Sequence, residues 1–264
     1  MSGLNALIWD VDGTLAETER DGHRIAFNTA FAELGLPWRW SEARYGALLV
    51  VTGGRERLLH DMASQPQAPA RAAEREALAS RLHQLKNQRY AEIVATGKIA
   101  LRPGVVALMA DCRLAGLPMA IATTTSRSNV DALLKAHFGP GWESGFAAVL
   151  CAEDAPLKKP HPQVYRQALE GLGLPARSVL AIEDSPPGVA ACRAAAVPVI
   201  VARSVYFADF DALDALAVGA GLHSRIGWKQ ADNQPLATDA SRELRVDLDL
   251  LREWHARGPV PAAS

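Results

Sequence analysis

Short apolar runs alternate with amphipathic stretches over much of the chain. Residues 4–9 are apolar and run directly into Asp10, which predicts a short buried strand followed by a turn at Asp12-Gly13-Thr14. Strands that alternate with helices predict an α/β fold with a doubly wound parallel sheet. Beyond residue 101 the pattern predicts this alternation, with helices at 105–115, 127–137, 162–172 and 186–196 and strands at 118–122, 148–150, 178–182 and 197–202.

The stretch between the first strand and this alternating region is helical in pattern. Apolar residues recur at a near-helical period over residues 20–34, and a long polar helix is expected from about residue 70 to 96. We therefore predict an α/β core of residues 1–16 and 97–264, with a small helical cap of residues 17–96 inserted after the first strand. Ligands of open parallel sheets bind at the carboxyl ends of the strands, so this insert would cover the ligand site as a lid.

The C-terminal stretch from residue 219 has a weaker pattern. Residues 248–254 predict a terminal helix, and residues 258–264 are expected to fray. The full length of 264 residues is enough for one large α/β domain and a smaller inserted one.

The overall charge and the cysteine content narrow the class of protein. The formal net charge is -1, so no strong overall attraction to nucleic acids or anionic membranes is expected. Three cysteines without a CxxC or Cys/His cluster are typical of reduced thiols in a cytosolic protein. No window of ~20 uncharged apolar residues occurs, so no membrane span is predicted. We therefore expect a cytoplasmic protein that binds neither nucleic acid nor membrane.

Four polar segments follow predicted strands and are expected to meet at one edge of the sheet. They are Asp10-Val11-Asp12-Gly13-Thr14, Ala122-Thr123-Thr124-Thr125, Lys158-Lys159-Pro160 and Ile182-Glu183-Asp184-Ser185. Crowded carboxylates repel one another, and Mg²⁺ would offset this repulsion because it prefers oxygen ligands and shares phosphate oxygens. Lysine and threonine donors bind phosphate, and a carboxylate can attack phosphorus as a nucleophile. The set predicts magnesium-dependent phosphoryl transfer.

The residues alone leave other interpretations open. Asp10 and Asp12 could form an ordinary strand-end turn, and Thr123 could cap the helix that begins near Ser126. Of the adjacent Lys158 and Lys159, we expect one to be solvated. A receiver-type domain, in which an aspartate accepts phosphate as a signal, uses similar carboxylates. A lid that excludes water suits an enzyme with turnover better.

These segments, in this order, resemble the haloacid dehalogenase (HAD) superfamily. The resemblance rests on Asp-Val-Asp-Gly-Thr at residues 10–14, with Thr123, Lys159 and Glu183-Asp184 following. The helical insert is similar to the cap of the β-phosphoglucomutase-like subfamily, and the resemblance implies a Rossmann-like core beneath it. Four further segments resemble the CbbY-type phosphatases of xylulose 1,5-bisphosphate: Glu17-Thr18-Glu19, His23-Arg24-Ile25-Ala26-Phe27, Gly53-Gly54-Arg55-Glu56-Arg57 and Ala122-Thr123-Thr124-Thr125-Ser126.

The resemblance implies a role for each matching residue. Asp10 would be the nucleophile and a Mg²⁺ ligand. Asp12 would be the general acid and base, and its backbone carbonyl would bind the metal. Asp184 would be the third metal ligand, with Glu183 nearby. Thr123 and Lys159 would bind the phosphoryl group of the substrate. The rest of the substrate would be contacted by Glu17, His23, Tyr45, Gly54, Arg55, Arg57, Thr124 and Thr125.

Three departures from the family pattern bear on substrate preference rather than on the chemistry, and one of them is the extension over residues 219–264, which is longer than is usual. Arg55 stands where the CbbY-type group typically has lysine, and Pro186-Pro187-Gly188 replaces a run that commonly contains asparagine. The expected partner is a small phosphorylated metabolite, and the expected assembly is a monomer or weak dimer. A sugar phosphomutase and a phosphoglycolate-type phosphatase remain alternatives. A non-catalytic regulatory member is disfavoured, because the core carboxylates and the lysine are intact.

Overall fold

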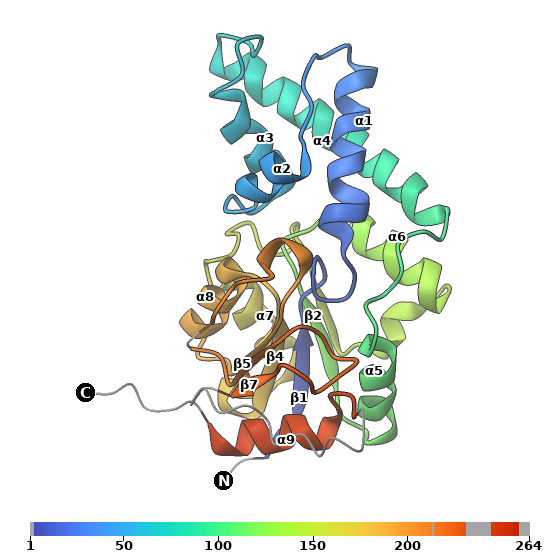
Figure 1. Cartoon of the computed structure of the whole chain (residues 1–264), viewed down its shortest axis with the longest axis vertical. Helices are drawn as coiled ribbons and strands as arrows, with labels where there is room; N and C mark the ends of the chain where they lie inside the picture. The colour runs from blue at the N-terminus through green and yellow to red at the C-terminus, as the bar shows by residue number, and fades with distance from the viewer. Residues whose placement is uncertain (1–2, 213, 231–243, 259–264) are drawn as a thin grey trace, which may run out of the picture.

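A mostly parallel sheet forms the centre of the molecule (Figure 1). The computed structural model describes residues 3–212, 214–230 and 244–258. Within these residues the strands are β1 (Ala6–Trp9), β2 (Met119–Ala122), β3 (Ala148–Leu150), β4 (Val179–Glu183), β5 (Val199–Ala202), β6 (Ala217–Gly219) and β7 (Lys229–Gln230). Their order is β3-β2-β1-β4-β5-β6-β7, and neighbours run parallel except β6 and β7. The predicted doubly wound α/β core is confirmed.

Helices cover both faces of this sheet because its strands are apolar on both. Along β1, Leu7 and Trp9 pack into one cluster of buried side chains, and Ala6 and Ile8 pack into another. Five helices close these clusters: α5 (Val105–Leu114), α6 (Arg127–Phe138) and α9 (Leu248–Arg257) on the first, and α7 (Gln163–Leu172) and α8 (Pro186–Ala194) on the second. The helical period of apolar residues located the core helices correctly. The continuously apolar runs located the strands, because these strands are buried on both faces.

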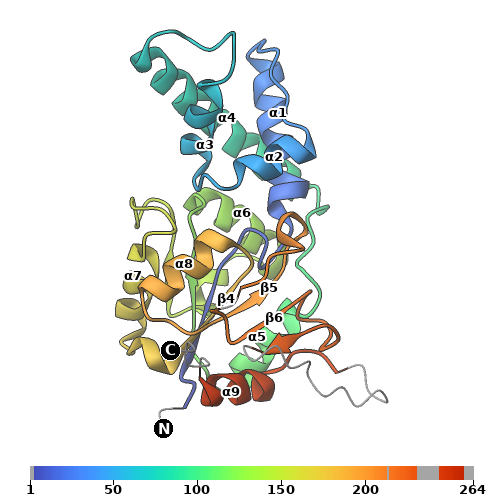
Figure 2. The same cartoon turned by 60° about the vertical axis from the view of Figure 1, so that its left-hand side comes forward.

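The inserted helices form a layer above the carboxyl-terminal edge of the sheet (Figures 1 and 2). They are the π-helical turn η1 (Glu19–His23), α1 (Arg24–Glu33), α2 (Glu42–Leu48), α3 (Gly54–Met62) and α4 (Ala72–Ala95). Phe27, Phe31, Trp38, Trp40 and Tyr45 fill the interior of this layer. The ring centroids of Phe27 and Trp40 lie 4.8 Å apart, and those of Phe31 and Trp40 lie 5.0 Å apart. The layer therefore has an aromatic core separate from that of the sheet.

The chain passes between the sheet and the helical layer twice, and the two crossings are bonded to each other. Ala16 pairs antiparallel with Leu101, and the backbone N–H of Arg102 donates to the Leu15 carbonyl at 2.7 Å. These crossings lie close to the expected domain boundaries at residues 16 and 97. The division into two domains itself stays a prediction.

The C-terminal part adds structure that the sequence pattern did not predict. β6 and β7 extend the sheet beyond β5, and Trp228 stacks on Trp254 of α9 with ring centroids 5.0 Å apart. Residues 259–264, which make up most of the tail expected to fray, lie outside the described residues. No helix of the described ranges is both long and apolar enough to cross a membrane. Three short 3₁₀ turns complete the elements: η2 (Trp142–Gly145), η3 (Ala176–Ser178) and η4 (Val205–Phe207).

Candidate active site

Lys159 joins two carboxylates at the carboxyl edge of the sheet. Asp10 follows β1 and Glu183 ends β4, and both side chains are buried. The Nζ of Lys159 lies 2.6 Å from Asp10 Oδ1, 2.6 Å from Glu183 Oε1 and 2.9 Å from the Ala122 carbonyl. Its three protons therefore have three acceptors. Burial lowers the pKa of Lys159, but the two carboxylates outweigh it and raise the pKa overall, so the ammonium stays charged.

Three buried carboxylates crowd together beside this lysine. Asp10, Glu183 and Asp184 each offer an oxygen atom, and these oxygens lie within 4.8 Å of one another. Burial raises the pKa of Asp10 to about 7, although Lys159 opposes this. Burial and the neighbouring carboxylates also raise the pKa of Asp184 well above its usual range. A divalent cation would stabilise the ionised form of both groups.

The hydrogen bonds decide which of these carboxylates has room for a metal. Glu183 accepts from Lys159 and from the Tyr165 hydroxyl at 2.5 Å through Oε1. Through Oε2 it accepts from the Asp184 N–H at 3.1 Å and from Ser185 Oγ at 3.2 Å. Asp184 Oδ1 is buried and has no hydrogen-bond partner among the described residues. Asp10 and Asp184 are therefore the side chains that fit a cation, and Glu183 holds the surrounding groups in place.

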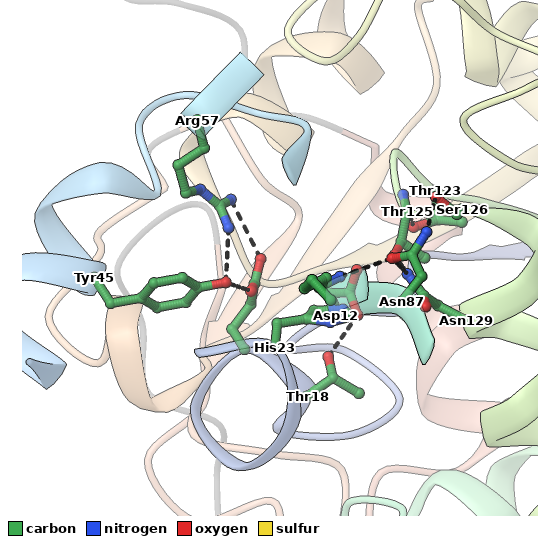
Figure 3. Close-up of polar contacts among 12 residues, drawn as sticks. Asp12, Thr18, His23, Tyr45, Arg57, Asn87, Thr123, Thr125, Ser126 and Asn129 are labelled. Carbon is green, nitrogen blue, oxygen red and sulfur yellow. Dashed lines mark hydrogen bonds and ion pairs between the residues drawn. The ribbon is translucent and has the colours of Figure 1, made fainter. Parts of the chain in front are cut away.

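Asp12 lies beside this cluster and is bound by two residues of the helical layer. Its Oδ1 accepts from Thr18 Oγ1 at 2.5 Å and lies 3.0 Å from His23 Nε2 (Figure 3). The His23 ring stacks on Tyr90 with a centroid distance of 4.2 Å, which fixes its orientation. Burial raises the pKa of Asp12, but the facing His23 and these hydrogen bonds outweigh it and hold the pKa well below its usual range. Asp12 is therefore ionised at neutral pH.

Two adjoining cavities lie between the sheet edge and the helical layer. The smaller, of about 60 Å³, is lined by the reacting groups predicted from the sequence: Asp10, Thr123, Lys159 and Asp184. The larger, of about 150 Å³, is lined mainly by the helical layer and the loop after β2. Four residues line both cavities: Asp12, Glu19, Arg57 and Thr124. A substrate whose phosphoryl group lies in the smaller cavity would therefore extend past Asp12 into the larger one.

Most of the residues expected to face the substrate line one of these cavities. Glu17 lines the smaller cavity, and His23, Gly54, Arg55 and Thr125 line the larger one. Tyr45 lines neither. It is fully buried, and its hydroxyl donates to Glu19 and accepts from Arg57 Nη1 at 2.7 Å. Tyr45 therefore positions two cavity residues, which differs from the direct substrate contact that we expected.

The two arginines of α3 are held very differently. Arg57 is buried, and its Nη2 lies 3.4 Å from Glu19 Oε1. Arg55 leaves 41% of its side chain exposed and pairs with Glu76 of α4. Arg57 is thus fixed in the cavity wall, whereas Arg55 needs to break only one exposed pair in order to reorient.

Lys86 of α4 is a cavity residue that we did not predict. It is 3% exposed, lines the larger cavity, and places Nζ 5.2 Å from the ring centre of Phe27 and 5.4 Å from that of Tyr90. Burial lowers the pKa of Lys86 to about 8. The sequence carried a signal for it, because Lys86 is four residues from both Leu82 and Tyr90. A lysine on the apolar face of a helix needs a functional or structural reason.

The loop after β2 is hydrogen-bonded to the helical layer. Asn87 of α4 donates to Ser126 Oγ at 3.3 Å and accepts from Asn129 at 3.2 Å (Figure 3). Asn129 also donates to Thr125 Oγ1 at 3.1 Å, and the Thr125 N–H donates to Thr123 Oγ1 at 3.3 Å. Thr123 therefore stabilises its own turn rather than the N-terminus of α6. Its side chain lines the smaller cavity.

Comparison with protein families agrees with this geometry. A family model described as haloacid dehalogenase-like hydrolase matches residues 4–196. The chain belongs to the haloacid dehalogenase-like hydrolases. The match spans both chain crossings, the inserted helices and all four strand-end segments.

Similar proteins place the chain close to the CbbY proteins of this family. It is 44% identical to CbbY of Cupriavidus necator over 252 residues, which cover 96% of this chain and 97% of that protein. It is 43% identical to CbbY of Rhodobacter capsulatus over 243 residues, which cover 91% of this chain and 99% of that protein. The resemblance seen in the sequence is confirmed, and the protein is a phosphatase.

Solved structures extend the likeness to three dimensions. A crystal structure of CbbY from Rhodobacter sphaeroides in complex with xylulose-(1,5)bisphosphate matches with a TM-score of 0.76 and 38% identity, covering 81% of this chain and 93% of that chain. A β-phosphoglucomutase from Clostridium difficile matches with a TM-score of 0.68 at 16% identity, covering 96% of this chain and 98% of that chain. The second likeness shows the shared fold alone.

Proposed function

We propose that this phosphatase hydrolyses a sugar bisphosphate, with xylulose 1,5-bisphosphate as the favoured substrate. The observation that carries the proposal is the pair of adjoining cavities, one with the reacting groups and one with cationic side chains. The similar CbbY structure in complex with xylulose-(1,5)bisphosphate supports the same choice. A substrate with two phosphates would place one in each cavity.

Asp10 is the proposed nucleophile. Its carboxylate is held by Lys159 at 2.6 Å, and attack on phosphorus would form an aspartyl-phosphate. The Lys159 ammonium and the Thr123 hydroxyl line the same cavity and would bind the phosphoryl oxygens. The positive charge is fixed before the substrate arrives, so no reorganisation is needed during the transfer.

The residues around Asp10 fit Mg²⁺ as the cofactor. Asp10, Asp184 and the backbone carbonyl of Asp12 would hold it, and the unpartnered Asp184 Oδ1 supports this assignment. When bound, the ion would neutralise negative charge on the carboxylates and on the transferring phosphoryl group. Glu183 would hold Lys159 and the Asp184 backbone in place next to the ion.

Asp12 is the proposed general acid and base. Its contacts with Thr18 and His23 stabilise the ionised form, which suits the activation of water in the hydrolytic step. Donation of a proton to the leaving sugar oxygen requires a higher pKa. Burial of Asp12 acts in that direction and its contacts with His23 and Thr18 act against it, so Asp12 must take up a proton before it can donate one to the leaving oxygen.

The second phosphate of the substrate would occupy the larger cavity. Cationic side chains from the helical layer and from the core line it together: Arg55, Arg57, Lys86 and Lys158. Gly54 begins α3 at this cavity, and a Cβ there would lie 3.1 Å from His83 and 3.2 Å from Phe27. A glycine keeps the wall open at the point where the helix N-terminus attracts an anion.

A phosphate-release assay over sugar monophosphates and bisphosphates tests the proposal. The panel includes pentulose bisphosphates, hexose phosphates and phosphoglycolate, and we expect the highest kcat/KM for a pentulose bisphosphate. Consumption of the sugar with equimolar phosphate release supports a phosphatase. Conversion to an isomeric sugar phosphate without net release would identify a phosphomutase instead, and preferred turnover of phosphoglycolate would exclude the sugar bisphosphate.

A further inference from the structure

Arg102 lies at the second chain crossing, directly after the pairing of Ala16 with Leu101. Only 11% of its side chain is exposed, and it lines neither active-site cavity. Its Nε lies 3.4 Å from Glu17 Oε1. Its two Nη atoms donate to four backbone carbonyls, those of Gly13, Ala202 at 2.8 Å, Arg203 at 2.5 Å and Ala220 at 3.0 Å. The four Nη protons therefore each have a carbonyl acceptor, and Nε forms an ion pair with Glu17.

Gly13 and Glu17 belong to the loop that carries Asp12. Gly13 packs so closely on Asp184 that a Cβ would lie 2.1 Å from Asp184 Oδ2, and its φ is +88°. The second oxygen of Glu17 accepts from the Val205 N–H at 3.2 Å. A displacement of this loop would therefore move Asp12 and the Gly13–Asp184 contact together.

The opposite side of Arg102 contacts the C-terminal segment, by which we mean the described residues 217–230 and 244–258. Ala220 belongs to this segment, and a Cβ on Gly104 would come within 2.5 Å of the backbone of Leu222 in the same segment. Arg245 of the same segment makes a second, separate contact: its Nη1 lies 2.7 Å from Asp111 on α5. Among the described residues, Arg102 and Arg245 thus add to the pairing of β5 with β6, and of these two arginines only Arg102 also contacts the loop of Asp12.

We propose that Arg102 is a positioning residue that holds the Asp12 loop against the C-terminal segment and so sets the spacing between Asp12, Asp184 and Glu17. Four hydrogen bonds and one ion pair of one rigid guanidinium join three parts of the chain that are distant in sequence. This inference rests on the proposed roles of Asp12 and Asp184 and is independent of which sugar is the substrate. It gives the C-terminal segment a role in catalytic geometry.

Arg102→Ala and Arg245→Ala form a matched pair, because each removes one arginine contact of the same segment. Arg102→Ala should lower kcat/KM for p-nitrophenyl phosphate by about 100-fold, as a small misplacement of reacting groups does. It should also weaken Mg²⁺ binding, measured by calorimetry, by about tenfold. Arg245→Ala should leave both quantities close to those of the unmodified protein. Thermal melting followed by circular dichroism gives the folded fraction of each variant.

Chemical rescue separates positioning from stability. Free guanidinium at a concentration below that which unfolds the protein should restore part of the activity of Arg102→Ala and leave Arg245→Ala unchanged. Equal losses in the two variants, or a folded Arg102→Ala with unaltered Mg²⁺ binding, would overturn the inference. If Arg102→Ala does not fold, Arg102→Lys replaces it, because lysine keeps the charge and lacks the planar guanidinium. Unaltered Mg²⁺ binding by a folded Arg102→Lys would also overturn the inference. The aryl phosphate makes these results independent of the sugar proposal.

Discussion

The two adjoining cavities hold their charged groups in opposite ways. At the smaller cavity, Lys159 and the buried Glu183 behind it use all of their hydrogen-bonding capacity within one network. In the larger one, Lys86 lies over two aromatic rings and Arg55 forms an exposed pair with Glu76. Reacting groups need one fixed geometry, whereas groups that select a substrate can adjust as the lid closes. The chemistry should therefore tolerate far less change than the selectivity.

The largest effect should come from Asp10 in the smaller cavity. Asp10→Asn should lower kcat by at least about 1,000-fold, because the amide cannot attack phosphorus. Phosphate release and circular dichroism measure turnover and folding in the same preparation. Asp249→Asn on α9, whose side chain is 90% exposed, is the matched control and should keep full activity. Retained turnover in Asp10→Asn would refute the nucleophile assignment.

Removal of the metal should stop turnover almost as completely. A chelator should abolish hydrolysis and added Mg²⁺ should restore it, and metal-independent turnover would contradict the proposed cofactor. The pKa of Asp10 without metal is raised from 3.8 to about 7, so below pH 7 the folded protein holds a proton that Mg²⁺ must displace. Calorimetry should therefore show Mg²⁺ affinity falling by about tenfold per pH unit below pH 7.

In the larger cavity, loss of Lys86 should affect binding rather than chemistry. Lys86→Met should raise KM for a bisphosphate by about 10- to 100-fold and change KM for an aryl phosphate little. Because the pKa of Lys86 is about 8, its charge is present below pH 8 and lost above it. The preference for a bisphosphate should accordingly decline above pH 8, and Lys86→Met should remove that decline. Arg81→Met, at an exposed position of the same helix, is the matched control.

The smallest effect is expected from Arg55. Arg55→Ala should raise KM for a bisphosphate by about three- to tenfold, because an exposed side chain binds a phosphate in competition with water and with Glu76. Steady-state kinetics on a bisphosphate and on an aryl phosphate measure the difference. An equal rise for both substrates would show that Arg55 does not contact the second phosphate.

The carboxylates of the site could be predicted because they follow short apolar strands. Asp10 and Asp184 follow strands that are buried on both faces, and parallel strands bring their carboxyl ends to one edge. Lys159 and Thr123 were assigned by resemblance, and the structure places them in the same cavity. The seven-stranded extent of the sheet was not predicted, because β6 and β7 are too short to show a recognisable pattern of apolar residues.

The larger cavity was harder to predict because its residues depend on contacts between distant segments. Tyr45 looked like a ligand contact, yet the tertiary packing turns its hydroxyl toward Arg57 and Glu19. Lys86 stands in a long and mostly polar helix, and its burial follows from packing on Phe27. Arg102 binds backbone carbonyls, which no pattern of side-chain types reveals.

The paired crossings at Ala16 and Leu101 have a consequence for how such enzymes diversify. The insert leaves and re-enters the sheet at two neighbouring positions, so its ends are already joined by a backbone pair before any of its helices begin. A foreign helical layer spliced between these positions would meet the same closed junction and leave strand-end residues such as Asp10 untouched. Exchange of this insert can therefore change the substrate preference while Asp10 and Lys159 keep their places, and only the contacts that Thr18 and His23 make with Asp12 have to be rebuilt.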